Sequence, residues 1–248
     1  MASKKRVRIF AGPNGSGKSS LFRGFQQEIK EKTGFFVNAD EIELKLNQSS
    51  LIDLQHLGLS ATQATLDEFI NNSDSLSLIK KANDSGHKID LQIKENCLID
   101  NSVGSHSYEG SFVASFIRHL FVEQNKSFSF ETVMSHSSKV TEIIDMKNKG
   151  YTPYLYFVCI DKPEVNISRI TNRVVLGEHD VPSDKVIQRY QRSLELLHEV
   201  LPLCYRAYLF DNSGKEYELI AELYQGDLEI KTDFLPQWFI NYVLPYFE

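Results

Sequence analysis

The sequence predicts an α/β fold in which helices cover both faces of a parallel sheet. A glycine-rich loop at 12–19 lies between an apolar, β-favouring stretch at 7–11 and a segment with helical apolar spacing at 21–29. A second β-favouring stretch at 35–38 follows and completes the strand–helix–strand order of a parallel unit. The continuous apolar run at 154–160 is typical of a central strand buried on both faces.

The composition is that of an ordinary globular protein. Of the 248 residues, 42% are hydrophobic and 24% are charged, and we predict a single domain over 1–248. The net charge of −6 lacks the basic excess of a nucleic-acid binder, so a nucleic-acid partner is not expected. The three cysteines have unrelated spacings, which fit neither a disulfide framework nor a zinc site, and we expect reduced thiols.

The sequence shows no targeting or membrane-spanning pattern. The basic start at 1–6 precedes only a short apolar stretch at 7–11, which is too short for the apolar region of a signal peptide. No apolar run approaches membrane-spanning length. We therefore expect a cytoplasmic protein without a membrane partner.

The loop carries the phosphate-binding pattern G-x-x-x-x-G-K-S, and its strand and helix flanks are the context that this motif needs. Glycines let the backbone approach an anion, and the N–H groups of the loop and helix start point at phosphates. Lys18 is expected to reach the β- and γ-phosphates of ATP or GTP, and the Ser19 hydroxyl to ligate Mg²⁺. The alternative is a glycine-rich turn that binds nothing. The predicted nucleotide-binding residues here are Gly12, Pro13, Asn14, Gly15, Ser16, Gly17, Lys18, Ser19 and Ser20.

The first helix is predicted over 18–31, with Gly34 as its cap, and the second strand over 35–38. Asp40 then lies at the carboxyl end of that strand, where open α/β sheets bind ligands. It is a candidate catalytic base. Asp is also a favoured N-cap residue, so capping of the next helix is the open alternative.

Residues 44–110 are predicted to form a mixed insertion on the sheet, near the substrate. Helices are expected at 60–66 and 76–82, and a hairpin of strands at 87–93 and 97–100.

Three histidines lie in this insertion. His56, His87 and His106 have spacings that match no metal motif, so they are expected to be surface or hydrogen-bonded histidines.

A helix beginning at Ser111 and a strand at 127–130 lead to Glu131. A carboxylate at a sheet end beside a phosphate site is a candidate to orient the substrate or to hold Mg²⁺ through water. The alternative is a structural partner for a lysine or arginine.

The next segments predict a helical lid. A helix at 138–149 and the strand at 154–160 precede two helices, one on each side of the Gly/Pro hinge at 177–182, and the second of them is expected over 183–200. Such a lid, over about 169–192, would exclude water, and its arginines would stabilise negative charge. Solvated surface arginines are the alternative. The lid arginines are Arg169, Arg173, Arg189 and Arg192.

The C-terminal part completes the predicted sheet. A last sheet strand is expected at 207–210, and the loop at 211–214 is expected near the nucleotide base. Short elements follow at 217–223 and 227–230. The aromatic-rich stretch at 234–247 is expected to pack as a final helix, because that much aromatic surface would be sticky if exposed.

Taken together, these segments resemble the zeta-toxin-like phosphotransferases, in the branch often labelled "predicted ABC-type ATPase". The glycine-rich loop alone is shared by many families, whereas the Asn-Ala-Asp, Phe-Glu-Thr and Gly-x-His-Asp-Val-Pro blocks are specific in combination. The matching segments are 11–20, 36–41, 127–135, 172–182, 187–193 and 211–214.

The resemblance implies a P-loop kinase-like fold with an arginine-bearing lid. Studied relatives phosphorylate a hydroxyl of UDP-N-acetylglucosamine, and an antitoxin protein holds them inactive. By this resemblance Asp40 deprotonates the acceptor hydroxyl and Lys18 binds phosphate. The other roles implied are substrate binding by Asn38, Glu131, Thr132, Ser135 and His179, catalysis by the lid arginines Arg173 and Arg189, and nucleotide binding by Arg192 and Asn212.

The predicted function is γ-phosphoryl transfer from ATP or GTP to a hydroxyl of a small molecule, for which a UDP-amino sugar is one candidate. A slowly hydrolysing or non-catalytic nucleotide-binding regulatory module and a kinase for a nucleic-acid hydroxyl are the alternatives. A transporter ATPase is not expected, because the sequence has no Leu-Ser-Gly-Gly-Gln block.

Overall fold

The computed structural model describes residues 4–28, 34–175 and 181–247, which form two compact units. Unit 1 comprises Met1–Gly34 and Ser129–Glu248, and unit 2 comprises Phe35–Phe128. The insertion predicted at 44–110 falls inside unit 2. In the described part of the chain, no helix is both long enough and apolar enough to cross a lipid bilayer.

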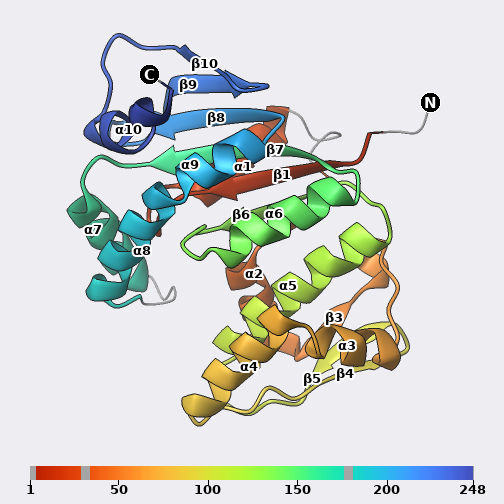
Figure 1. The fold of residues 1–248 in the computed structure, drawn as a ribbon. Helices are drawn as coiled ribbons and strands as arrows, with labels where there is room; N and C mark the ends of the chain where they lie inside the picture. Colours follow the sequence, from red (N-terminus) through yellow and green to blue (C-terminus); the bar gives the residue numbers. More distant parts are fainter. Residues whose placement is uncertain (1–3, 29–33, 176–180, 248) are drawn as a thin grey trace. The chain divides into compact units, whose positions relative to one another are not determined.

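Unit 1 is built on a mostly parallel sheet, whose strands follow the order β10-β9-β8-β7-β1-β6 (Figure 1). Strands β1, β7 and β8 run parallel, and β9 and β10 add an antiparallel edge. The side chains of β7 from Leu155 to Cys159 are buried, which confirms the predicted central strand. The strands are β1 (Arg6–Ala11), β6 (Phe128–Thr132), β7 (Thr152–Cys159), β8 (Arg206–Asp211), β9 (Glu218–Tyr224) and β10 (Asp227–Ile230).

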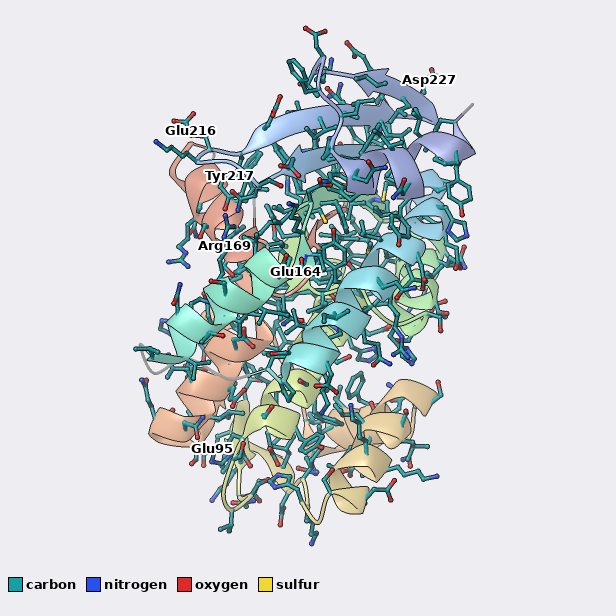
Figure 2. The ribbon with its side chains drawn as sticks, turned by 90° about the vertical axis from the view of Figure 1, so that its left-hand side faces the viewer. Glu95, Glu164, Arg169, Glu216, Tyr217 and Asp227 are labelled. Atoms are coloured by element: carbon teal, nitrogen blue, oxygen red, sulfur yellow. The ribbon has the colours of Figure 1, made fainter. Side chains whose placement is uncertain are left out.

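Helices cover both faces of this sheet. Helix α1 lies on one face, and α6 and α9 lie on the opposite face (Figures 1 and 2). The predicted α/β fold class is thereby confirmed. The helices of unit 1 are α1 (Lys18–Glu28), α6 (Ser138–Asn148), α7 (Pro163–Val175), α8 (Ser183–Glu195), α9 (Leu197–Val200) and α10 (Gln237–Tyr242), with 3₁₀ turns η2 (Leu201–Leu203) and η3 (Leu244–Tyr246).

The C-terminal segments differ from the sequence prediction. The helix expected from Ser183 to Val200 is divided at Leu196 into α8 and α9. The final helix expected at 234–247 is only the short α10, followed by a 3₁₀ turn. Trp238 on α10 is buried, its Nε1 donates to Asp211 Oδ2 at 2.8 Å, and its backbone N–H donates to Asp161 Oδ1 at 3.0 Å. These bonds attach the aromatic C-terminal segment to the end of β8 and to the loop that follows β7.

Unit 2 packs helices around the long, largely buried helix α5 and a three-stranded antiparallel sheet of order β3-β5-β4. Phe69 of α3 meets Phe112 and Phe116 of α5, with ring centroids 5.4 Å and 5.2 Å apart. The elements are β2 (Phe35–Val37), α2 (Ala39–Ser49), β3 (Leu51–Asp53), η1 (Gln55–Leu57), α3 (Gln63–Ile70), α4 (Ser73–Asp84), β4 (Leu91–Lys94), β5 (Cys97–Asp100) and α5 (Ser107–Glu123).

Side-chain caps explain why helices α3 and α4 of unit 2 begin at other residues than predicted. Thr62 forms a capping box with Thr65, and α3 therefore begins at Gln63 instead of Ser60. Asn72 accepts the N–H of Ser75 and starts α4 at Ser73.

The hairpin prediction is right in kind but wrong in extent. Glu95 and Asn96 adopt left-handed φ values of 51° and 60°, which suits a two-residue hairpin turn, and β5 spans the predicted residues. Strand β4, however, begins only at Leu91, and His87 precedes it in a loop.

Candidate active site

The glycine-rich loop between β1 and α1 adopts a backbone that only glycine accepts at three positions. Gly12, Gly15 and Gly17 have φ values of 139°, 74° and 102°. A Cβ atom at Gly12 would lie 2.0 Å from the carbonyl oxygen of Val158, so the loop runs against strand β7. The pattern G-x-x-x-x-G-K-S therefore folds as a tight, preformed loop at the carboxyl end of β1.

Two buried asparagines hold the loop from other elements of unit 1. Asn166 on α7 donates its Nδ2 to the Asn14 carbonyl oxygen at 2.6 Å. Asn212, directly after β8, donates its Nδ2 to the Ser16 carbonyl oxygen at 2.7 Å. Both bonds satisfy carbonyl groups, so they fix the loop without engaging its N–H groups.

A tyrosine and an arginine extend this support (Figure 2). The Tyr217 hydroxyl donates to the Gly17 carbonyl oxygen at 2.7 Å, and Arg169 Nη2 donates to the Asn212 carbonyl oxygen at 3.0 Å. Burial raises the pKa of the Tyr217 phenol, so it remains a protonated donor at neutral pH. Arg169, which the sequence placed in a lid, thus also supports the loop that follows β8.

Lys18 and Ser19 converge on one carboxylate, Glu131 near the end of β6. Ser19 Oγ donates to Glu131 Oε2 at 2.7 Å, and Lys18 Nζ lies 3.7 Å from Glu131 Oε1. Lys18 Nζ also donates to the Pro13 carbonyl oxygen at 2.9 Å. The side chains of Lys18 and Glu131 are only 5% and 14% exposed, so this ion pair lies in a poorly solvated place.

The loop residues fit a nucleotide phosphate group and its Mg²⁺. Ser16 Oγ and Asn14 Oδ1 are buried and have no hydrogen-bond partner among the described residues. Their hydrogen-bonding capacity is therefore available to a ligand. A hydroxyl and a carboxylate, from Ser19 and Glu131, are the oxygen donors that Mg²⁺ prefers. Ser20 is exposed in the first turn of α1.

Asn38 and Asp40 both belong to unit 2, where their local roles are clear. Asn38 is the N-cap of α2, because its side chain accepts the N–H groups of Asp40 at 2.8 Å and of Glu41 at 3.4 Å. The alternative reading of Asp40 as the N-cap is therefore wrong. Asp40 is exposed in the first turn of α2, and its role as catalytic base stays a prediction.

The other predicted site residues lie in different surroundings. Arg173 on α7 and Arg189 on α8 are partly exposed, and Thr132 Oγ1 accepts the N–H of Met134 at 3.1 Å. Ser135 and Arg192 line one hollow of about 440 Å³, to which Lys18 and Glu131 contribute no lining atoms. The predicted substrate residue His179 and most of the hinge lie at 176–180, outside the described residues.

Unit 2 holds an apolar pocket of about 220 Å³ at the start of α2. Most of its lining is aromatic or aliphatic, and the polar exceptions are Asn38, Glu41 and Lys45. Asp40 is not among the described residues that line it. The lining residues are Phe35, Phe36, Val37, Asn38, Glu41, Ile42, Lys45, Ile52, Leu57, Ile117 and Phe121.

Sequence reasoning missed two residues that hold the glycine-rich loop, Asn166 and Tyr217. Asn166 lies one helical turn before the buried Ile170, so a polar residue on the buried face of α7 was a usable signal. Tyr217 carries no such signal, because its contact with Gly17 arises only when β8 and β9 pair.

Comparison with known proteins adds one short sequence relative. No family model matches the chain. An uncharacterized protein of Haemophilus influenzae is 31% identical over 72 residues, which is 29% of this chain and 51% of that protein. The chain thus covers only about half of this relative's length.

Solved structures give a wider match. Crystal structures of AvrRxo1-ORF1:AvrRxo1-ORF2 with sulphate ions and of AvrRxo1-ORF1:-ORF2 with ATP match 93% of this chain, with TM-scores of 0.57 and 0.58. The sequence identity is 13% in both, and the match covers 62% and 61% of those chains, under two thirds of their length. A structure of the PezAT toxin–antitoxin system of Streptococcus pneumoniae matches with 16% identity and a TM-score of 0.46, over 86% of this chain and 70% of that one. The likeness to the AvrRxo1 chains shows the fold, and this chain shares with them the α/β fold that its sequence predicts.

Proposed function

We propose that this chain is a zeta-toxin-like phosphotransferase that moves the γ-phosphoryl group of ATP or GTP to a hydroxyl of a small molecule. The observation that carries the proposal is the convergence of Lys18 and Ser19 on Glu131 beneath a preformed phosphate-binding loop. In phosphoryl transfer the protein contributes mainly positioning and charge stabilisation, and this arrangement supplies both.

In the donor half of the site, each residue has a task that follows from its contacts. Lys18 brings a positive charge to the loop and would bind the β- and γ-phosphates. Glu131 accepts a hydrogen bond from the Ser19 hydroxyl, which leaves the oxygen lone pairs of Ser19 available to Mg²⁺. Mg²⁺, when bound, would neutralise phosphate charge. Asn166 and Asn212 keep the loop carbonyls away from the phosphates.

In the acceptor half, we assign Asp40 as the base that orients or deprotonates the hydroxyl, with Arg173 and Arg189 stabilising the transferring group. The apolar pocket of unit 2 is a candidate for part of the acceptor. Its volume of about 220 Å³ is below the roughly 300–1,000 Å³ of pockets that hold a drug-sized ligand. A UDP-amino sugar would therefore place only one of its parts there.

The test is an unbiased labelling experiment. Purified protein is incubated with Mg²⁺, γ-labelled ATP or GTP and a metabolite extract, and the labelled product is isolated. We expect a small phosphorylated metabolite, and we expect Lys18→Met and Asp40→Asn to abolish the labelling. Arg6→Met serves as the matched control, because Arg6 is exposed at the amino-terminal end of β1, opposite the end that carries the glycine-rich loop.

Other results would contradict the proposal in distinct ways. ATP turnover that needs no acceptor would favour a nucleotide-binding regulatory module. Salt-sensitive labelling of RNA or DNA ends would favour a nucleic-acid kinase. Labelling that survives Lys18→Met would remove the glycine-rich loop from the reaction.

We further propose that an antitoxin protein restrains this activity. The AvrRxo1 structures contain two proteins together, ORF1 and ORF2, and this supports the proposal of a protein partner. If the proposal holds, expression of the wild-type chain alone arrests growth of the host cell, and Lys18→Met relieves the arrest. Equal growth inhibition by both forms would contradict it.

A further inference from the structure

Unit 2 contains a buried group of metal-ligating side chains that the proposed kinase chemistry does not use. Asp100 ends β5, His106 is the N-cap residue of α5, and Glu109 lies in the first turn of α5. One ligand atom from each lies within 4.8 Å of the others, and all three residues are buried. We propose that Asp100, His106 and Glu109 bind a divalent transition-metal ion of the Zn²⁺ type.

The first argument is an unpartnered carboxylate oxygen. The Glu109 side chain is 0% exposed, and its Oε1 is hydrogen-bonded to His87 Nε2 at 2.6 Å. Its other oxygen, Oε2, is buried and has no hydrogen-bond partner among the described residues. A buried polar atom without a partner is destabilising, and more so on a charged group. A cation bound at Oε2 removes that penalty.

The second argument is the charge of the group. The Asp100 side chain is also 0% exposed, its Oδ2 lies 2.7 Å from His106 Nδ1, and its Oδ1 accepts the N–H of Ser102 at 2.9 Å. Asp100 and Glu109 are therefore two fully buried carboxylates, whose combined charge a dication matches. The hydrogen bonds of His87 and His106 engage Glu109 Oε1 and Asp100 Oδ2, and they leave Glu109 Oε2 without a partner among the described residues.

The ligand chemistry selects the class of ion. One imidazole and two carboxylates form a mixed nitrogen and oxygen set, which suits Zn²⁺ and related ions. Mg²⁺ and Ca²⁺ prefer oxygen ligands alone. The sequence spacing gave no sign of this set, because the hairpin return of β5 and the start of α5 bring the residues together.

His87 has a positioning role in this arrangement. Its bond to Glu109 Oε1 leaves Oε2 for the ion, in the way that outer hydrogen bonds orient metal ligands. The His87 ring lies 5.7 Å from the Tyr108 ring, and the Tyr108 hydroxyl is 2.9 Å from Ser85 Oγ. The ion would thus connect β5, α5 and the segment after α4, and its effect would be to stabilise unit 2.

The test uses the full chain, freed of metal with a chelator and titrated with Zn²⁺ alone. We expect one Zn²⁺ per chain by calorimetry. Free Zn²⁺ at about 100 times its Kd should raise the Tm by about 5–10 °C, and Mg²⁺ at the same concentration should not. A folded wild-type chain that shows no saturable Zn²⁺ binding overturns the proposal, whatever its kinase activity.

Matched variants locate the ion. Glu109→Gln and His106→Gln should weaken Zn²⁺ binding by more than about 100-fold, and His87→Gln by about 10–100-fold. His56→Gln, whose side chain is 88% exposed, should leave binding unchanged. Loss of binding in His56→Gln together with retention in Glu109→Gln would overturn the assignment.

Cobalt provides a readout that needs no variant. Co²⁺ added to the metal-free wild-type chain should give the visible absorption of a low-coordinate nitrogen and oxygen site. A spectrum identical to that of hydrated Co²⁺ would contradict the proposal.

Discussion

At the scale of single residues, Glu131 connects the lysine of the glycine-rich loop to the hydroxyl that would hold Mg²⁺. Its two oxygens face Ser19 Oγ and Lys18 Nζ separately, at 2.7 Å and 3.7 Å. The low exposure of Lys18 and Glu131 strengthens both interactions relative to a surface pair. The sequence left Glu131 open between a functional residue and a structural partner for a lysine. The structure shows the lysine contact, and that lysine belongs to the phosphate-binding motif.

The first prediction concerns Glu131→Gln. The amide keeps the shape of the side chain but accepts a weaker hydrogen bond from the Ser19 hydroxyl. The apparent Mg²⁺ affinity and the nucleotide-dependent rate should therefore fall by about 10–100-fold. Titration of activity with Mg²⁺ measures both effects. Glu142→Gln removes a partly exposed i,i+3 ion pair with Lys139 on α6 and should leave both values unchanged. An unaltered Mg²⁺ dependence in Glu131→Gln would contradict the role assigned to Glu131.

At the scale of elements, helices α2 and α5 of unit 2 approach closely at a glycine. A Cβ atom at Gly110 would lie 2.8 Å from Glu43 Cβ and 3.0 Å from the Ala39 carbonyl oxygen. The first turn of α2 therefore depends on the smallest side chain in α5. This is the turn that carries Asp40, so packing in α5 sets the position of the proposed base.

The second prediction follows from this contact. Gly110→Ala should lower the free energy of unfolding by about 1–3 kcal/mol, because the added methyl group overpacks the helix pair. Gly24→Ala in α1 is the matched control, since a Cβ atom there would have no neighbour within 4 Å. It should raise the free energy of unfolding by about 0.5–1 kcal/mol through helix propensity. Urea denaturation measures both, and equal effects of the two substitutions would contradict the packing argument.

The elements themselves show what a single sequence can and cannot predict. The 18–28 part of α1, the hairpin turn at 95–96 and the buried strand β7 are local in origin, and the sequence predicts them. The starts of α3 and α4 depend on side-chain caps at Thr62 and Asn72, which apolar spacing does not reveal.

At the scale of the whole molecule, the residues around the glycine-rich loop come from distant parts of the chain. Asn166, Asn212 and Tyr217 meet loop carbonyls across 152, 196 and 200 positions of sequence. The glycine-rich motif itself is predictable from the sequence. Contacts over such distances leave no periodic pattern in the sequence, so most of the residues that hold the loop are not predictable from it. Asn212 is the exception, since its block was part of the family resemblance.

The third prediction concerns the thiols and high pH. Burial raises the pKa of Cys204 to about 12 from 9.0, and burial also raises the pKa of Cys159. Between pH 9.0 and about pH 12, the Cys204 thiol has lost its proton in the unfolded chain and keeps it in the folded chain. The free energy of unfolding should therefore be unaffected below pH 8 and fall above about pH 9, by about 1.4 kcal/mol per pH unit for each such thiol.

Alanine variants isolate this thiol contribution from that of the buried tyrosines. Cys204→Ala should make the decline between pH 9 and 11 shallower, while Cys97→Ala, at a partly exposed thiol, should leave the slope near that of the wild type. Denaturant unfolding at a series of pH values measures the slopes. Identical slopes in all three proteins would contradict the burial of Cys204.

The chain has one tryptophan, and its place gives the protein a built-in optical probe. The indole of Trp238 is hydrogen-bonded to Asp211, and the next residue, Asn212, is bonded to the glycine-rich loop at Ser16. A shift of that loop on nucleotide binding would therefore reach the indole through two adjacent residues, Asp211 and Asn212. We expect ligand occupancy to change the intrinsic fluorescence, which needs neither a label nor knowledge of the acceptor.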